Sequence, residues 1–135
     1  QTHQTARFGI RVDNTERMPE IICDGIILAT AAGSTAYNLS AYGPILPIGA
    51  ELLALTPISV FRPRRWRGAI LRDNSKVTIE ILEPHHRPVA ASADNQEIRD
   101  VKKVTINLDR SKSMIILFDK DRSLDERVLA EQFAH

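Results

Sequence analysis

The stretch that decides how this chain folds is DGIILATAAGSTAYNLSAYGP, residues 24–44. The apolar run Ile26–Ala29 follows Gly25 and predicts a short buried strand, although periodicity alone leaves a buried helix open. A turn of small residues comes next, in which Gly33 is free to take a positive φ angle. Ser34 or Thr35 then suits the N-cap of a short helix over 34–41. The stretch therefore predicts a strand, a glycine turn and the start of a helix.

This arrangement favours a polar or anionic ligand, because the first N–H groups of a helix have no partner inside the helix. Thr35, Asn38 and Ser40 place hydroxyl and amide groups there, and Tyr37 offers a flat face to an aromatic ring. From local chemistry alone, a capped turn without any ligand is the more common arrangement.

Short alternating segments on both sides of this stretch predict half-buried strands, with polar turns between them. A strand is expected over Phe8–Val12, and a second strand is expected to follow the turn at Asp13 and run into Ile21–Ile22. Further alternating strands are expected at Val77–Ile81 and Val104–Leu108, and a short apolar run predicts another at Met114–Phe118, with turns at 73–75, 83–84, 94–95 and 109–111.

Many short strands with regular turns predict a mostly-β fold of two packed antiparallel sheets. The tail is expected to form a helix, because Ser123 and Glu126 make a capping box ahead of apolar residues at helical spacing. We therefore expect one domain over 1–135, a two-layer antiparallel β-sandwich with a short internal helix and a C-terminal helix.

Composition excludes several classes of protein. The chain has 135 residues with a net charge of +1, which gives no bulk electrostatic reason to bind nucleic acid or an anionic membrane. No apolar run approaches the roughly 20 residues of a membrane helix. The single Cys23 rules out an internal disulfide and suits a reducing, cytoplasmic location. The first residue is Gln1 rather than Met, which suggests a cut inside a longer protein.

Several catalytic motifs are absent from the sequence. There is no P-loop, no Gly-x-Gly-x-x-Gly dinucleotide fingerprint and no Gly-x-Ser-x-Gly nucleophile elbow. The histidines and Cys23 lack the spacing of zinc ligands, so no metal site is predicted. A hydrolase-like pair of Ser34 with His85 or His86 stays open as a minor alternative.

The sequence of residues 24–44 closely resembles a motif of the NAD kinase family. That family typically has an Asp-Gly strand start, then Thr-Pro-Thr-Gly-Ser-Thr-Ala-Tyr, then a serine and a Gly-Pro pair. Here the matching residues are Asp24-Gly25, 30–40 and Gly43-Pro44. Residues 55–58, 61–63 and 93–96 are also similar, so the resemblance covers nearly the whole chain. The departures are Ala31-Ala32, which shape the turn, and Tyr42, which alters the local wall of the site.

The resemblance implies a role for each matched residue. Asp24 would approach the nicotinamide riboside end of NAD. The pocket for that end would be lined by Thr35, Ala36, Tyr37 and Ser40. A hairpin turn carrying Asp94, with Asn95 beside it, would reach the NAD site of a neighbouring subunit. The resemblance therefore also implies a homo-oligomer, a dimer or a tetramer.

The activity that the resemblance implies is phosphoryl transfer from ATP or polyphosphate to the adenosine ribose 2′-OH of NAD, which gives NADP. Such chemistry needs an orienting carboxylate and a divalent metal, Mg²⁺. The family's catalytic aspartate belongs to a Gly-Gly-Asp-Gly motif, and this sequence has no Gly-Gly pair. We therefore expect no catalytic residue in this chain and no kinase activity from it alone. The alternatives are the C-terminal domain of a lipid or sphingoid-base kinase and a non-catalytic nucleotide-binding sandwich.

A basic cluster surrounds Pro63 and Trp66 and consists of Arg62, Arg64, Arg65 and Arg67. Arginine forks hold phosphates, so ATP, NAD or polyphosphate are candidate ligands. A solvated loop or a subunit contact accounts for the same composition, because arginine and tryptophan are also enriched at protein interfaces. The candidate phosphate-binding or interface residues are therefore Arg62, Arg64 and Arg65.

Overall fold

A computed structural model of the protein describes residues 5–35, 43–63, 66–84, 89–93, 96–107 and 114–119. Within these residues the chain forms strands and one short 3₁₀ turn, η1, at Ala32–Thr35. The strands are β1 Ala6–Val12, β2 Thr15–Cys23, β3 Gly25–Thr30, β4 Leu52–Ile58, β5 Ala69–Arg72, β6 Val77–Leu82, β7 Val89–Ala93, β8 Gln96–Val101, β9 Lys103–Ile106 and β10 Met114–Asp119.

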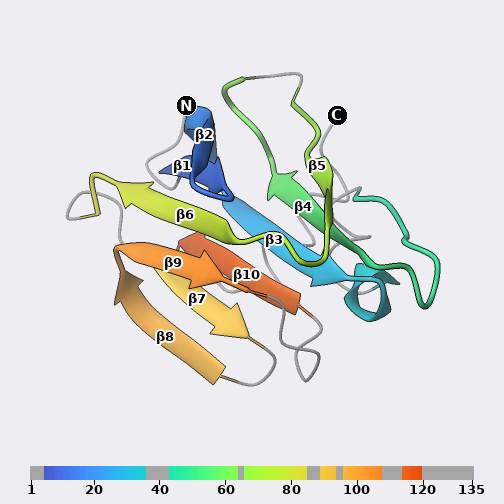
Figure 1. The fold of residues 1–135 in the computed structure, drawn as a ribbon. Coiled ribbons are helices and arrows are strands. Elements are labelled where there is room, and N and C mark those ends of the chain that lie inside the picture. The colour runs from blue at the N-terminus through green and yellow to red at the C-terminus, as the bar shows by residue number, and fades with distance from the viewer. Residues whose placement is uncertain are drawn as a thin grey trace.

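The strands form two antiparallel sheets that pack face to face, as Figure 1 shows. One sheet has four strands in the order β2-β1-β6-β9, and the other has six in the order β5-β4-β3-β10-β7-β8. The chain passes from the small sheet to the large one between β2 and β3, and it returns between β5 and β6. The predicted two-layer antiparallel sandwich is confirmed.

The core lies between the two sheets, where apolar side chains from both inner faces meet. Phe8 and Ile79 come from the four-stranded sheet, while Ile26, Leu55 and Leu117 come from the six-stranded sheet, and all are essentially inaccessible to solvent. Alternation places these residues inward, because successive side chains of a strand point to opposite faces of the sheet. Burial of this apolar area is the main term that stabilises the fold.

Most of the strands expected from the alternating pattern are present. Phe8–Val12 lies in β1, and Asp13 turns the chain into β2 with a positive φ angle of 52°. The segments expected at Val77–Ile81 and Met114–Phe118 lie in β6 and β10. β9 is confirmed from Lys103 to Ile106, and position 108 lies outside the described residues.

Four strands that the pattern did not predict are β4, β5, β7 and β8. The expected short helix over 34–41 is replaced, in the part that is described, by η1, which begins at Ala32. Gly33 lies inside this turn, and the described glycines with positive φ are Gly49 and Gly68. The expectation for Gly33 was therefore wrong. The predicted tail helix from Ser123 lies outside the described residues.

Candidate functional site

The first part of the candidate site is the corner where β2 ends and β3 begins, which we call the Asp24 corner (residues 22–25 and 58–62). The Asp24 N–H donates a hydrogen bond to the Ile58 carbonyl oxygen at 2.9 Å, so β4 fixes the backbone of this residue. The Asp24 side chain is only partly buried. A carboxylate is thus held near the surface at a point where the chain changes sheets.

Gly25 is required at this corner because the backbone of β10 passes close to it. A Cβ atom at this position would lie 2.6 Å from the Leu117 carbonyl oxygen, a distance that real Cβ atoms do not reach. The residue beside Asp24 is therefore determined by packing, and the Asp-Gly pair combines a functional candidate with a structural necessity.

Cys23 completes the corner on its inner side. Its Sγ donates to the Gly25 carbonyl oxygen at 3.2 Å, and the side chain is fully buried. Burial raises the pKa of the Cys23 thiol far above its ordinary value. The neutral thiol is a poor nucleophile and a poor metal ligand, so Cys23 contributes packing and not chemistry.

Arg62 lies at the same corner, which the sequence did not predict. The Arg62 carbonyl oxygen accepts a hydrogen bond from the Ile22 N–H at 2.7 Å, and the Phe61 N–H donates to the Ile22 carbonyl oxygen at 2.7 Å. This pairing holds the segment after β4 along β2 and leaves the Arg62 side chain exposed. Asp24 and Arg62 therefore occupy one corner, although they are distant in sequence.

The other residues of the basic cluster differ from one another in how far they are buried. Trp66 is partly buried and packs against the main core, so its ring is used in packing. Arg67 is exposed, and Arg64 and Arg65 lie outside the described residues. Of the cluster, Arg62 is the side chain that the structure connects to the Asp24 corner.

The second part of the candidate site is η1, which follows β3. Ser34 organises it: its hydroxyl donates to the Ala31 carbonyl oxygen at 2.9 Å and accepts from the Leu46 N–H at 3.0 Å. The Gly33 N–H lies 3.4 Å from Thr30 Oγ1. These contacts hold the turn to the segment after Gly43, and Leu46 packs there against Ala31 and Ala54.

These contacts correct two expectations for Ser34. It lies inside the 3₁₀ turn and does not act as the N-cap of a helix. Its side chain is fully buried, and its oxygen is engaged both as donor and as acceptor. Such a hydroxyl is not available to attack a substrate, which removes the minor hydrolase alternative. His85 and His86 lie outside the described residues.

The structure places the two parts of the site at opposite ends of one strand. β3 has 6 residues, and at about 3.4 Å per residue it separates the Asp24 corner from η1 by roughly 20 Å. Figure 1 shows η1 at the far end of β3. Thr35 is the last residue of η1. The remaining candidates, Ala36, Tyr37, Ser40, Asp94 and Asn95, lie outside the described residues.

The Asp24 corner and η1 both lie within a stretch that matches a known protein family. The model of the ATP-NAD kinase C-terminal domain matches residues 3–118, which include both parts of the site. The chain belongs to the ATP-NAD kinase C-terminal domain family. The matched range includes the Asp24-Gly25 pair, β3 and the turn that follows it.

Relatives in this family are similar over the whole chain. The NAD kinase of Caulobacter vibrioides is 62% identical over 134 residues, which cover 99% of this chain and 52% of that protein. The NAD kinase of Hyphomonas neptunium is 60% identical over 134 residues, with the same coverage of both proteins. The chain therefore spans about half the length of the curated relatives it matches.

Solved structures from the same family have a similar fold. An NAD kinase from Archaeoglobus fulgidus in complex with ATP matches with a TM-score of 0.69 and 26% identity, over 96% of this chain and 50% of that one. A yeast NADH kinase complexed with NADH matches with a TM-score of 0.63 and 26% identity, over 90% of this chain and 32% of that one.

The metal expected for this family's chemistry has no ligand set in the part of the chain that the structure describes. No group of three or more His, Cys, Asp or Glu side chains is placed there to hold a metal ion. The described residues thus include no such group of metal ligands. Nor do they include a helix of sufficient length and hydropathy to span a membrane.

Proposed function

We propose that this chain is the NAD-binding domain, residues 1–135, of an NAD kinase that transfers a phosphoryl group to the adenosine ribose 2′-OH of NAD. The observation that carries the proposal is the family motif folded as a surface carboxylate at Asp24, a buried strand and the ordered turn η1. We propose a cytoplasmic location and ATP or polyphosphate as the donor.

Phosphoryl transfer depends mainly on positioning and on stabilising charge, so it separates naturally into binding and catalytic parts. In the proposal this chain binds and orients NAD, while the orienting carboxylate and the Mg²⁺ site are supplied from outside it. Asp24 accepts hydrogen bonds from ribose hydroxyls, and Arg62 pairs with phosphate at the same corner. Isolated, the chain is expected to form no NADP.

The separation of the two parts supports a site that is completed by a second copy of the chain. β3 separates the Asp24 corner from the start of η1 by roughly 20 Å if each of its residues adds about 3.4 Å. A homo-oligomer brings the η1 end of one subunit, or its residues Asp94 and Asn95, to the Asp24 corner of another. We propose a dimer or tetramer on this ground.

A calorimetric titration of the full-length protein with NAD tests the proposal. We expect Asp24→Asn to weaken NAD binding about tenfold, since a charged hydrogen-bond acceptor is lost. The matched control is Asp73→Asn, in the turn between β5 and β6, which should leave the affinity unchanged. Equal affinities for the parent protein and Asp24→Asn would remove the Asp24 corner from the site.

A further inference from the structure

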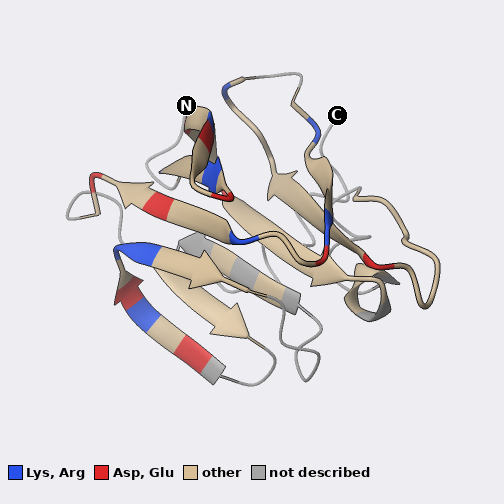
Figure 2. Ribbon diagram, viewed as in Figure 1, with Lys and Arg blue, Asp and Glu red and all other residues tan. Residues whose placement is uncertain are grey.

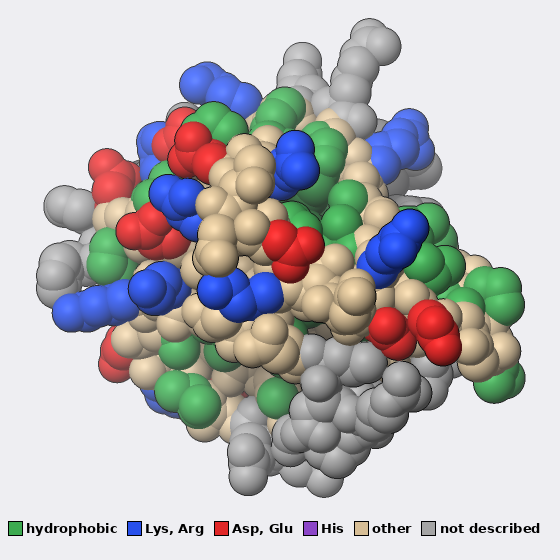
Figure 3. All heavy atoms as spheres, viewed as in Figure 1, with side chains coloured by type: hydrophobic (Ala, Val, Ile, Leu, Met, Phe, Trp, Pro, Cys, Tyr) green, Lys and Arg blue, Asp and Glu red, His purple; other side chains and the backbone are tan. Residues whose placement is uncertain are grey.

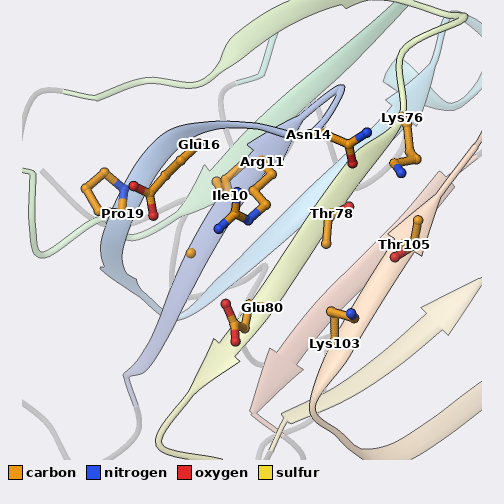
Figure 4. A pocket seen from close by; sticks show the side chains of 11 residues that line it. Ile10, Arg11, Asn14, Glu16, Pro19, Lys76, Thr78, Glu80, Lys103 and Thr105 are labelled. Carbon is orange, nitrogen blue, oxygen red and sulfur yellow. The ribbon is translucent and has the colours of Figure 1, made fainter.

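The outer face of the four-stranded sheet carries a hollow that the candidate NAD site does not use. Its volume is about 270 Å³, and residues of β1, β2, β6 and β9 line it together with Asn14 in the β1–β2 turn and Lys76 just before β6. Figure 4 shows these side chains around the hollow. Figure 3 shows that basic and acidic side chains are interspersed on this face rather than gathered in one block.

The strand register places a cationic and hydroxyl-bearing group at one end of the hollow. Thr78 of β6 lies directly opposite Arg11 of β1 and directly opposite Thr105 of β9. Lys76 lines the same hollow two residues before Thr78. Directly opposed residues have Cβ atoms about 5 Å apart, so Arg11, Thr78 and Thr105 form one row across β1, β6 and β9, with Lys76 beside it just before β6. We call this set the Thr78 cluster.

Acidic side chains stand beside this cluster. Glu80 follows Thr78 on the same face of β6 and lies opposite Lys103 of β9, and Glu16 lies opposite Arg11. Figure 2 shows the acidic position of β6 beside the basic start of β9. Opposite charges in this register normally close onto each other.

In this hollow the charges stay apart. Among the described residues, Arg7 on the same strand has Glu20 at 2.9 Å and Glu83 at 3.3 Å. The described ion pairs include no partner for Arg11 or Lys76, nor for Glu80 and Lys103, which face each other. The same face of the sheet thus carries an ion-paired cluster around Arg7 and, around the hollow, charged side chains that form none of the described ion pairs. We call the latter the open set of charges.

Gly9 is the reason that the hollow exists. It lies on β1 between Arg7 and Arg11 and opposite Glu80, and it lines the hollow. With no side chain there, the floor between Arg11 and Glu80 is bare backbone. A Cβ atom at Gly9 would approach the Pro19 carbonyl oxygen to 3.3 Å, so even a small side chain would crowd β2.

We propose that this hollow binds a small polyol phosphate such as a sugar phosphate. The phosphate group lies in the Thr78 cluster, where Arg11 and Lys76 supply charge and the threonines supply hydroxyl donors. Glu80, and Glu16 opposite Arg11, would repel a bare anion, but their carboxylates accept hydrogen bonds from hydroxyl groups along the ligand. This combination selects a phosphate that carries hydroxyls over phosphate alone.

The test is an amide NMR titration of the full-length protein in phosphate-free buffer at fixed ionic strength, with ribose 5-phosphate and inorganic phosphate as probes. We expect shifts centred on Thr78 and Thr105, and tighter binding of ribose 5-phosphate. Arg11→Gln and Lys76→Gln should each weaken both probes about tenfold. Glu80→Gln should weaken ribose 5-phosphate alone and leave or improve binding of inorganic phosphate.

Lys102→Gln is the matched control, because Lys102 is an exposed lysine beside Lys103 that does not line the hollow. An equal effect of Lys102→Gln and Lys76→Gln, or shifts that avoid Thr78, would overturn the proposal. The same follows if neither probe binds at tens of millimolar. NAD affinity should be unchanged in Arg11→Gln, so failure here is distinguishable from failure of the proposed NAD site.

Discussion

Single residues at the Asp24 corner show how packing constrains the short segment that carries the proposed binding residue. Gly25 is dictated by the approach of Leu117, and Cys23 by a space that is closed to solvent. Asp24 between them has its backbone held by Ile58 and its side chain near the surface. Rigid neighbours fix the position of the carboxylate, which is what a binding residue requires.

The buried thiol of Cys23 predicts a dependence of stability on pH. Because burial raises its pKa, the folded protein keeps the proton at pH values where the unfolded chain loses it. The stabilisation is complete below the ordinary pKa of about 8.5 and decreases as the pH rises above that value, by at most about 1.4 kcal/mol per pH unit. Urea unfolding between pH 7.5 and 9.5 measures it.

The variant Cys23→Ala provides the reference for this pH series, since it removes the thiol and leaves the other titrating groups in place. The difference in free energy of unfolding between the parent and Cys23→Ala should shrink as the pH rises. Parallel curves, or rapid labelling of Cys23 by a thiol reagent in the native state at pH 8, would contradict the assignment.

Thr56 predicts a gain in stability on substitution. It is 1% exposed and lies opposite Ile27, and among the described residues its Oγ1 has no hydrogen-bond partner. Replacing this hydroxyl by a methyl group of the same shape in Thr56→Val should raise the free energy of unfolding by about 1–2 kcal/mol. Thr105→Val, at an exposed position, should change it little. A destabilised Thr56→Val would indicate that the hydroxyl has a partner.

At the scale of elements, close backbone approaches decide how β3, β4 and β10 are held together. Three glycine substitutions separate crowding from backbone strain. In Gly49→Ala the added methyl group has open space around it, but the backbone φ of 86° is unfavourable for alanine. This substitution should lower the free energy of unfolding by about 1–2 kcal/mol. Gly25→Ala places the new methyl group 2.6 Å from the Leu117 carbonyl oxygen and 3.3 Å from Ile58 Cδ1, and should cost about 1–3 kcal/mol. Gly68→Ala meets both a φ of 112° and the Leu55 carbonyl, so it should cost the most.

Urea unfolding of these three variants measures the order directly. A cost for Gly68→Ala no greater than that for Gly49→Ala would show that β4 and β5 adapt to the added atom. In that case the close packing described between Gly68 and Leu55 would not hold in solution.

The strands that alternation predicted are those with one solvated face, whereas β3 and β10 were predicted from short apolar runs. In β1 and β6 an apolar residue alternates with a polar one, because one side meets the core and the other meets water. β4 is buried along most of its length and includes Pro57, so it neither alternates nor resembles a central strand. β7 consists mainly of small residues, and β8 is exposed at successive positions, so both lack the alternating pattern.

The candidate site was predicted in part. The residues of the motif were identified from their order in the sequence. The position of Ser34 inside a turn, however, depends on its hydrogen bond to Leu46, which lies 12 residues away in the chain. The position of Arg62 beside the Asp24 corner likewise depends on pairing with Ile22. Local sequence carries no signal for such pairings, because they are set by the order of the strands in the sheets.

At the scale of the whole molecule, the two sheets carry different features. The six-stranded sheet carries β3, with the Asp24 corner at one end and η1 at the other. The four-stranded sheet covers the core and exposes the open set of charges around Gly9. The proposed NAD site lies at the corner between β2 and β3, and the proposed polyol phosphate site lies on the outer face around Gly9; no residue belongs to both the Asp24 corner and the hollow, so each can be altered without direct damage to the other.

The central claim is that this chain is the NAD-binding half of an NAD kinase, and formation of NADP tests it most directly. Full-length protein and the isolated chain are each incubated with NAD, Mg²⁺ and either ATP or polyphosphate, and NADP is measured. The account predicts NADP from the full-length protein with at least one donor and none from the isolated chain. No NADP from the full-length protein with either donor, or NADP from the isolated chain, would contradict it.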